Sequence, residues 1–243
     1  MNCISCHNEL TEGSRFCKYC GATQLDILEE TETRNSSVII LVSFYSIELI
    51  VCLLVTYVDS FKTLRGVLVF DAVSVINTLV FGAIILKDLK DALAWNNFSW
   101  LKLFQYMFIA ILFSIAVQFL TRLMNENIFD EEYYYYYAFI NTSYPKIFML
   151  LVIAVQPAIF EELAFRGIIT SQLKKITDAR QTIFITAFVF AIIHLSFLSL
   201  IWLLPFAVLL GYIRERENTI WYGVLMHFSF NAIACLFEFF YLG

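Results

Sequence analysis

The sequence predicts an all-α membrane protein: a polytopic bundle of about seven transmembrane helices, preceded by a small cysteine-rich module. The 243-residue chain is 60% hydrophobic and has a mean hydropathy of +0.74, whereas soluble domains are about 45–50% apolar. Apolar runs of about 17–25 residues, the length that crosses a bilayer as a helix, recur along it. The first 25 residues differ, because they hold four of the six cysteines.

The predicted spans follow the apolar runs. They are residues 37–58, 66–86, 101–121, 147–172, 181–198, 200–213 and 220–241. The second span is amphipathic, since it carries Asp71 and Asn77. The sixth is short and contains Pro205, which removes a helical backbone donor. An alternative interpretation of residues 181–213 is a pair of helices with a break near residues 194–199.

Basic residues predict the orientation of the bundle, because Lys and Arg favour cytoplasmic loops. With a cytoplasmic N-terminus, eleven of the sixteen Lys and Arg residues fall on the inner side, four fall outside, and Arg166 lies within the membrane. The inner residues are Arg15, Lys18, Arg34, Lys87, Lys90, Lys102, Lys174, Lys175, Arg180, Arg214 and Arg216. We therefore expect a multi-pass protein of the cell membrane with a cytoplasmic N-terminus. We expect no cleavable signal peptide, because cysteines and acids stand where a basic and an apolar region would be.

The N-terminal module contains two metal-binding motifs. Cys3-Ile-Ser-Cys6 and Cys17-Lys-Tyr-Cys20 are Cys-x-x-Cys pairs separated by ten residues. Each pair can place two thiolates on one tetrahedral zinc ion at about 2.3 Å, and Gly21 permits the tight turn that follows. A segment this short has no core of its own, so metal binding would supply its folding free energy. The pattern predicts a zinc ribbon.

The alternative for these cysteines is a pair of disulfides. A cytoplasmic segment disfavours that alternative, because thiols stay reduced there. A site closed by four cysteines is structural and has no open position for chemistry, so we expect the ribbon to bind a protein partner or to regulate. The chain then divides into a zinc ribbon (1–25), a polar linker (26–36) and a transmembrane domain (37–243).

Three polar clusters interrupt the later spans. They are Glu161-Glu162-Leu-Ala-Phe-Arg166, Phe190-Ala-Ile-Ile-His194 and His227-Phe-Ser-Phe-Asn231. One ionised group at the bilayer centre costs about 2.5–3.5 kcal/mol even on the most permissive scales. Such groups are therefore expected to face protein or water and to serve a function.

Helical spacing and depth place these groups relative to one another. Glu162 and Arg166 are four residues apart and share a face on which they can pair, whereas Glu161 points about 100° away. Counted from basic residues at the inner ends of their helices, Glu161, His194 and His227 lie roughly 20, 21 and 17 Å deep at 1.5 Å per residue. Groups at one depth on separate helices are expected to converge on one cavity.

The clusters supply the groups needed for peptide hydrolysis. A carboxylate with an imidazole can deprotonate water and later protonate a leaving amine, and a second imidazole with a carboxamide can donate to an oxyanion. The candidate residues are Glu161, His194, His227 and Asn231. Two histidines and a glutamate can also hold a catalytic zinc ion. Asparagine is a poor zinc ligand, which favours direct acid–base chemistry.

The ordered trio resembles the motifs of the CAAX-protease and bacteriocin-processing (CPBP/Abi) family of intramembrane proteases. That family has Glu-Glu-x-x-x-Arg, Phe-x-x-x-His and His-x-x-x-Asn on successive core helices, and every fixed position matches here. The resemblance covers about residues 147–235. It implies an all-helical membrane bundle with an internal site, and it leaves the ribbon outside the catalytic core.

The resemblance also implies a role for each motif residue. Water would be activated by Glu161 and His227, the oxyanion would be held by His194 and Asn231, and Glu162 and Arg166 would form a supporting pair. We therefore predict an intramembrane endopeptidase that hydrolyses a peptide bond in a membrane-associated or prenylated protein or peptide. Its partners are then the lipid bilayer and a membrane substrate, and no nucleic acid is expected.

Other functions stay open at this point. A non-catalytic membrane scaffold or sensor could keep the fold and work through the ribbon, although it has no need of both histidines and Asn231. A transporter could use the acids as a proton relay, although internal repeats and paired broken helices would then be expected. A zinc-dependent protease that uses the same residues is the alternative mechanism.

Overall fold

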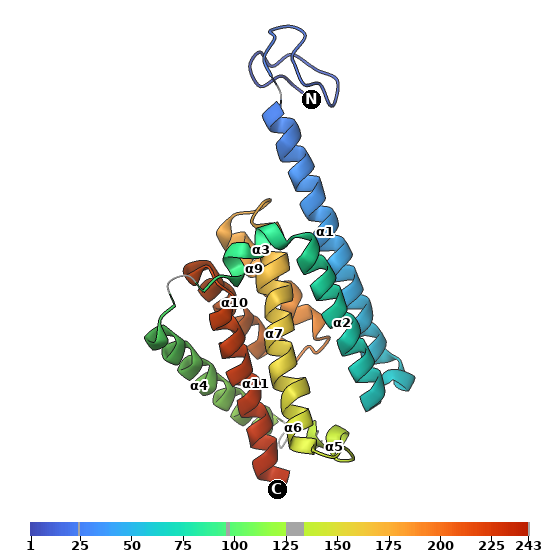
Figure 1. Cartoon of the computed structure of the whole chain (residues 1–243), viewed down its shortest axis with the longest axis vertical. Coiled ribbons are helices and arrows are strands. Elements are labelled where there is room, and N and C mark those ends of the chain that lie inside the picture. The colour runs from blue at the N-terminus through green and yellow to red at the C-terminus, as the bar shows by residue number, and fades with distance from the viewer. Residues whose placement is uncertain (24, 96–97, 125–133, 243) are drawn as a thin grey trace.

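The structure is a computed structural model that describes residues 1–23, 25–95, 98–124 and 134–242. Helices make up nearly all of this part (Figure 1). The strand-like pairings within it are two isolated bridges in the cysteine module, Asn2 with Glu9 and Phe16 with Thr23. The prediction of an all-helical bundle behind a small cysteine module is confirmed.

The helices are labelled in chain order in Figure 1. Their bounds are α1 (Leu25–Tyr57), η1 (Asp59–Phe61), α2 (Leu64–Ile84), α3 (Leu86–Leu93), α4 (Trp100–Met124), α5 (Tyr136–Phe139), α6 (Pro145–Met149), η3 (Leu150–Val155), α7 (Gln156–Glu162), η4 (Leu163–Ile169), α8 (Thr170–Leu173), α9 (Ala179–Ile193), α10 (Leu200–Glu217) and α11 (Trp221–Leu242). Residues 26–36, which we expect to link the ribbon to the membrane domain, lie in the first part of α1.

Five described helical stretches are long and apolar enough to cross a membrane, by length and composition. They are Thr31–Tyr57, Leu64–Ile84, Trp100–Met124, Pro145–Leu173 and Trp221–Phe240. The predicted number of seven spans is therefore approximate. The two remaining predicted spans, 181–198 and 200–213, correspond to α9 and α10. α9 is apolar but shorter, and α10 ends in the charged residues Arg214 to Glu217. The chain breaks between them, as the alternative interpretation of 181–213 expects, and Leu195 in the left-handed region (φ 51°) ends α9.

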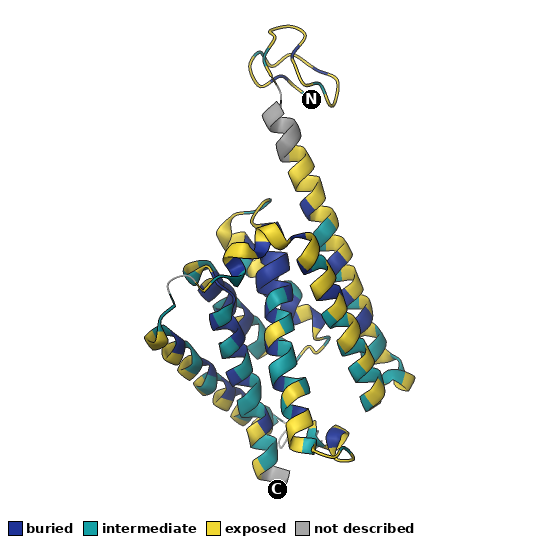
Figure 2. Ribbon diagram, in the orientation of Figure 1, coloured by how far each residue is buried: buried dark blue, intermediate teal, exposed yellow. Residues whose placement is uncertain are grey.

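Apolar side chains cover the outside of the bundle, and Figure 2 shows that exposed residues run along the outer faces of α1, α2 and α4. Large exposed side chains include Ile39, Val69, Ile76, Phe104, Phe108 and Phe188. A soluble monomer rarely exposes so continuous an apolar surface. Such a surface is expected to face the lipid of a bilayer, which supports a multi-pass membrane protein.

The stretch Pro145–Leu173 forms one continuous helical run with two π-helical segments, η3 and η4. π-helical turns shift the backbone hydrogen bonds and occur often at functional sites. Side chains bind carbonyl oxygens of η4: Thr170 Oγ1 donates to Phe165 O at 2.9 Å, and Arg214 Nε donates to Arg166 O at 3.1 Å. The run that carries Glu161 and Glu162 is thus held by its neighbours as well as by its own backbone.

Ion pairs gather at the end of the bundle where α3, α8 and α10 meet. Lys175 Nζ lies 2.6 Å from Asp88 Oδ2, and Lys174 Nζ lies 2.6 Å from Glu215 Oε2. Burial opposes ionisation of Asp88, but hydrogen bonds from Lys175 and Gln172 lower the pKa of its carboxyl below the ordinary value. Two of the basic residues assigned to the inner side, Lys174 and Lys175, therefore lie at one end of the bundle, which the predicted orientation would place in the cytoplasm.

A buried polar network joins α1 to α2. The Glu48 carboxylate accepts hydrogen bonds from Ser74 Oγ and from Asn77 Nδ2, the latter at 2.7 Å. Asn77 Nδ2 also lies 3.3 Å from Phe44 O. Polar residues of an amphipathic second span are thereby directed into the hairpin rather than toward lipid.

We expect Asn77→Leu to destabilise the protein, because it leaves the buried Glu48 carboxylate with one donor fewer. The cost of leaving a buried polar group unpaired is about 1–3 kcal/mol, and each kcal/mol lowers the melting temperature by roughly 2–4 °C in a chain of this size. Thermal unfolding in detergent measures the effect. Ile76→Leu, one residue away on the exposed side of α2, is the control, and equal melting temperatures for the two variants would contradict the prediction.

Candidate active site and metal centre

The carboxylate of Glu162 is buried among three motif helices, with none of its side chain exposed. Its Oε1 lies 2.9 Å from Arg166 Nη1 and 3.1 Å from His227 Nδ1. Glu162 and Arg166 thus form the ion pair that their spacing predicts. A carboxylate paired with arginine only accepts hydrogen bonds, so His227 Nδ1–H donates to it. In the neutral imidazole, the lone pair of Nε2 then points away from Glu162.

Glu161 stands on the other side of the same imidazole. Its Oε2 lies 3.9 Å from His227 Nε2, and about a third of the side chain is exposed. Oε2 itself is buried and has no hydrogen-bond partner among the described residues. A separation of 3.9 Å is too long for a direct hydrogen bond and suits two groups that share one water.

Arg166 ties this centre to α9 and α10. Its guanidinium is fully buried, Nη2 donates to Ala207 O at 3.2 Å, and Cζ lies 4.5 Å from the centre of the Phe190 ring. An unpaired arginine in this setting would be costly. Glu162, the carbonyl of Ala207 and the face of Phe190 offset this cost, and Arg166 Nε has no hydrogen-bond partner among the described residues.

His194 lies next to the centre but does not contact His227 directly. Its Nδ1 donates to Phe190 O at 2.8 Å, because a carbonyl only accepts. The Phe190 ring lies 4.8 Å from the His194 ring and 6.0 Å from the His227 ring, measured between ring centres. The predicted Phe-x-x-x-His motif therefore places one aromatic ring against both imidazoles.

Asn231 is bonded to the helical run that carries the glutamates. Its Nδ2 donates to Ile153 O at 2.9 Å. Pro157, four residues after Ile153, has no backbone N–H to offer that carbonyl in an α-helical pattern. Asn231 supplies a donor in its place, so one of its two amide hydrogens is already committed.

Gly223 is a site residue that the motifs do not reveal. It precedes His227 by one helical turn on α11, and a Cβ atom there would lie 2.7 Å from Glu162 Oε2. The absence of a side chain is what lets the buried carboxylate approach α11 closely enough to reach His227. Its spacing of four residues before His227 was the one signal available in the sequence.

A cavity of about 330 Å³ opens beside this centre. Glu161 and His194 line it from the motif helices, and Glu48 and Asp71 line it from α1 and α2. Its volume lies within the range of small-molecule and peptide side-chain pockets. The structure thus brings Glu161, Glu162, Arg166 and His227 into one network. His194 contacts the Phe190 ring, which also lies against Arg166. Asn231 is hydrogen-bonded to Ile153 O, on the helical run that carries Glu161 and Glu162.

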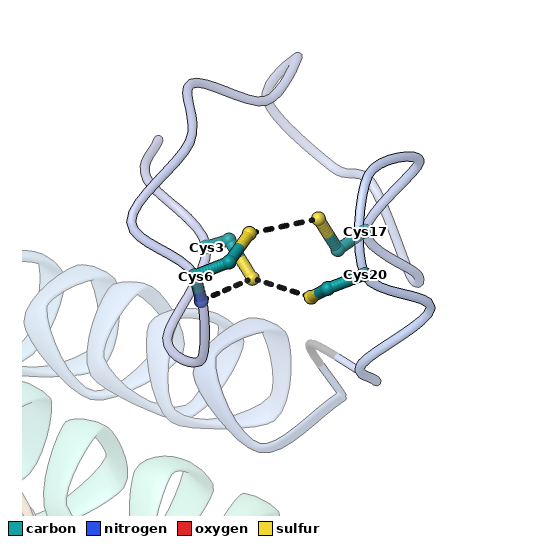
Figure 3. Close-up of side chains that lie close together, drawn as sticks. All are labelled: Cys3, Cys6, Cys17 and Cys20. Carbon is teal, nitrogen blue, oxygen red and sulfur yellow. Dashed lines mark hydrogen bonds between the residues drawn. The ribbon is translucent and has the colours of Figure 1, made fainter.

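The four cysteines of the N-terminal module face one another, as Figure 3 shows. Cys3 Sγ lies 3.6 Å from Cys20 Sγ, and Cys6 Sγ lies 3.6 Å from Cys17 Sγ. All four sulfur atoms lie within 4.8 Å of one another. Four sulfurs at about 2.3 Å from a tetrahedral ion would be about 3.8 Å apart, so the quartet fits a metal ion. Distances of this length also show four free thiols rather than disulfides.

The two halves of the module repeat the same turn fourteen residues apart. His7 N donates to Cys3 O at 3.0 Å, and Gly21 N donates to Cys17 O at 2.9 Å. Both donors have a positive φ, 59° for His7 and 73° for Gly21. Each Cys-x-x-Cys pair is therefore folded into a knuckle that turns two sulfurs inward.

The thiols differ in how easily they ionise. The backbone N–H of Cys6 lowers the pKa of the Cys3 thiol to about 6, although burial opposes this shift. A hydrogen bond from Ala22 would lower the pKa of Cys20, but the neighbouring sulfurs, Cys6 first, raise it to about 12. Four thiolates this close repel one another, and a divalent cation is the species that would let all four ionise together.

The fold and the polar centre define a helical membrane protein with a buried glutamate–histidine network beside a cavity. Residues 143–233 match the family described as Type II CAAX prenyl endopeptidase Rce1-like. This segment contains the three motifs, so the resemblance to intramembrane CAAX proteases is confirmed there, and the match supports an intramembrane endopeptidase in general. No curated protein and no solved structure matches the chain.

We expect Gly223→Ala to destabilise the protein, because the added methyl group meets a carboxylate that Arg166 and His227 hold in place. Gly82→Ala is the matched control: this glycine is also buried in a helix, and its added Cβ would lie 3.7 Å from Leu89 Cδ1, an ordinary contact. Alanine is favoured over glycine in a helix by about 0.5–1 kcal/mol, so the control should melt at the same or a higher temperature. A Gly223→Ala variant as stable as Gly82→Ala would show that the carboxylate is free to move.

Proposed function

We propose that this chain is an intramembrane endopeptidase that hydrolyses a peptide bond of a membrane-associated or prenylated protein or peptide. The observation that carries the proposal is the placement of Glu161 Oε2 and His227 Nε2, which are 3.9 Å apart and can both hydrogen-bond to one water that lies beside them. Glu162 orients the imidazole through Nδ1, as a buried acid does in hydrolases that use an oriented histidine. The family match at residues 143–233 supports the same reaction class.

The proposed reaction uses one water molecule held by Glu161 and His227. Glu161 removes a proton from this water as its oxygen bonds to the carbonyl carbon of the substrate. The carbonyl oxygen takes the negative charge of the tetrahedral intermediate. When the carbon–nitrogen bond breaks, the proton passes to the amine nitrogen, and a carboxylic acid and an amine are released.

His194 and Asn231 are proposed to hold the oxyanion. His194 lines the cavity, and its Nδ1–H is committed to Phe190 O. The imidazole can therefore donate to an oxyanion only from Nε2, in its doubly protonated form. Asn231 keeps one amide hydrogen after its bond to Ile153 O. Together they would stabilise charge that develops only in the transition state.

The substrate is proposed to enter through the cavity, which places the scissile bond within reach of Glu161. Its walls include α1 and α2, which lie outside the matched segment 143–233. A substrate held partly by the membrane would meet this opening without leaving the bilayer. We therefore propose that the α1–α2 hairpin contributes to the choice of substrate.

We expect Glu161→Gln to abolish cleavage of a membrane peptide while the melting temperature stays unchanged, because no described residue donates a hydrogen bond to its carboxylate. Loss of general acid–base catalysis is worth about 10²–10⁴ in rate. His194→Ala and His227→Ala should also abolish cleavage. The measurement is product formation by mass spectrometry with the purified full chain in proteoliposomes.

Two variants separate catalysis from folding. Glu215→Gln removes an acid that pairs with Lys174 at the inner end and should leave cleavage intact. Glu162→Gln should lower both activity and melting temperature, since it disturbs the pair with Arg166. Full cleavage by purified Glu161→Gln would reject the proposed mechanism, and absence of cleavage in every form of the protein, tested against the membrane proteome, would favour the scaffold or sensor.

We further propose that the ion held by Cys3, Cys6, Cys17 and Cys20 is zinc, in a structural role. The purified chain should contain about one zinc per molecule, and a Cys3→Ser/Cys6→Ser variant should contain none, because two of four ligands are lost. Cys52→Ser/Cys235→Ser is the control, since both cysteines lie outside the quartet. Metal analysis of the three proteins decides the identity and place of the ion.

The same preparation tests the alternative mechanism. Cleavage should survive removal of zinc by a chelator, because the cysteine quartet has no open position and Glu161 acts without it. Activity that is lost on chelation in the Cys3→Ser/Cys6→Ser variant, and is restored by zinc, would instead identify a zinc-dependent protease.

A further inference from the structure

A second cavity of about 370 Å³ lies between α9 and α10, away from the glutamate–histidine centre. Its floor is apolar and consists of Ile183, Phe184, Val208 and Tyr212. About half of the Phe184 and Tyr212 side chains is exposed, so the floor faces the surroundings of the bundle. We refer to this cavity as the α9–α10 groove.

Two arginines stand at one end of the groove. Arg180 is the second residue of α9, and Arg216 is the penultimate residue of α10. Phe184 lies about one helical turn beyond Arg180, and Val208 lies about two turns from Arg216, roughly 12 Å along the axis. The groove therefore begins at a charged helix end and continues along the apolar flank of the bundle.

The acids near these arginines are largely engaged elsewhere. Glu215 also lines the groove, and its carboxylate is neutralised by Lys174 at 2.6 Å. Glu217 binds Lys102 Nζ at 2.7 Å and also accepts from Tyr106, while Arg216 Nε lies farther from it, at 3.6 Å.

Arg180 has an aromatic neighbour and forms no ion pair with a described carboxylate. Its Cζ lies 6.0 Å from the Phe184 ring centre. Asp178, two residues earlier, caps α9 by accepting from Gln181 N at 2.8 Å. Two guanidinium groups thus leave a net positive charge at the mouth of an apolar groove.

We propose that the α9–α10 groove binds an anionic phospholipid, with the phosphate between Arg180 and Arg216 and an acyl chain along Ile183, Phe184 and Val208. The charges match a phosphate, which guanidinium groups bind through paired hydrogen bonds, and the floor matches a hydrocarbon chain. A free phosphate would leave the floor uncovered, and a zwitterionic headgroup would bring a cation beside two arginines. Basic pockets between helices at a cytoplasmic boundary are a known form of lipid recognition.

The test measures which lipids the purified full chain retains. The delipidated protein is titrated with phosphatidylglycerol, phosphatidylcholine or inorganic phosphate and examined by native mass spectrometry and thermal unfolding. We expect a preference for phosphatidylglycerol of about 30-fold, as two basic groups near an anionic headgroup would give. Arg180→Gln/Arg216→Gln should remove this preference. Lys62→Gln/Arg65→Gln, which changes the charge equally near the start of α2, should keep it.

A third variant tests the apolar part of the site. Val208→Trp fills the groove and leaves both arginines in place, so it should also lose phosphatidylglycerol. Retention of the lipid by Arg180→Gln/Arg216→Gln or by Val208→Trp would overturn the proposal. So would competition by inorganic phosphate at the concentration at which the lipid binds, because the site would then take a free anion. If the double arginine variant fails to fold, Val208→Trp and the phosphate competition still decide the question.

Discussion

The arrangement of the core depends on the contacts of the buried Glu162 carboxylate with Arg166 and His227. An ionised pair inside an apolar bundle needs further hydrogen bonds to offset its desolvation, and removal of one partner costs about 3–5 kcal/mol. Glu162 gains such a bond from His227 on α11, and Arg166 gains one to Ala207 O on α10, although Glu162 Oε2 and Arg166 Nε have no partner among the described residues. The position of one carboxylate therefore fixes three helices relative to one another, and Gly223 leaves the space that this position needs.

Sequence patterns predicted the features that depend on spacing along one helix. Apolar runs predicted the helical bundle, the four-residue interval predicted the pair of Glu162 and Arg166, and the two Cys-x-x-Cys motifs predicted the sulfur quartet. Features that depend on contacts between helices were not accessible. Asn231 donates to Ile153 O, a carbonyl that Pro157 leaves without an α-helical donor. The role of Gly223 can be recognised only when the helix that packs against it is known. The π-helical segments change the hydrogen bonding but not the apolar composition, so hydropathy could not locate them.

The cysteine quartet and the glutamate–histidine centre differ in character. The cysteine quartet is formed by two similar knuckles and offers four like ligands to one ion. The glutamate–histidine centre is asymmetric: one carboxylate is fully buried and paired, and its sequence neighbour is partly exposed beside a cavity. The two adjacent glutamates can serve different purposes because a helix turns them about 100° apart. Glu162 pairs with Arg166 and His227 inside the bundle, whereas Glu161 lines the cavity.

The unbroken course of α1 has a mechanical consequence. This helix has 33 residues, which corresponds to about 50 Å at 1.5 Å per residue. The cysteine module stands beside its first turn in Figure 1, and Glu48 in its later half forms part of the cavity wall. A helix without a break transmits tilt from one end to the other. A protein bound to the module would therefore tilt α1 as a rigid rod. That tilt would move Glu48 in the wall of the cavity that Glu161 also lines.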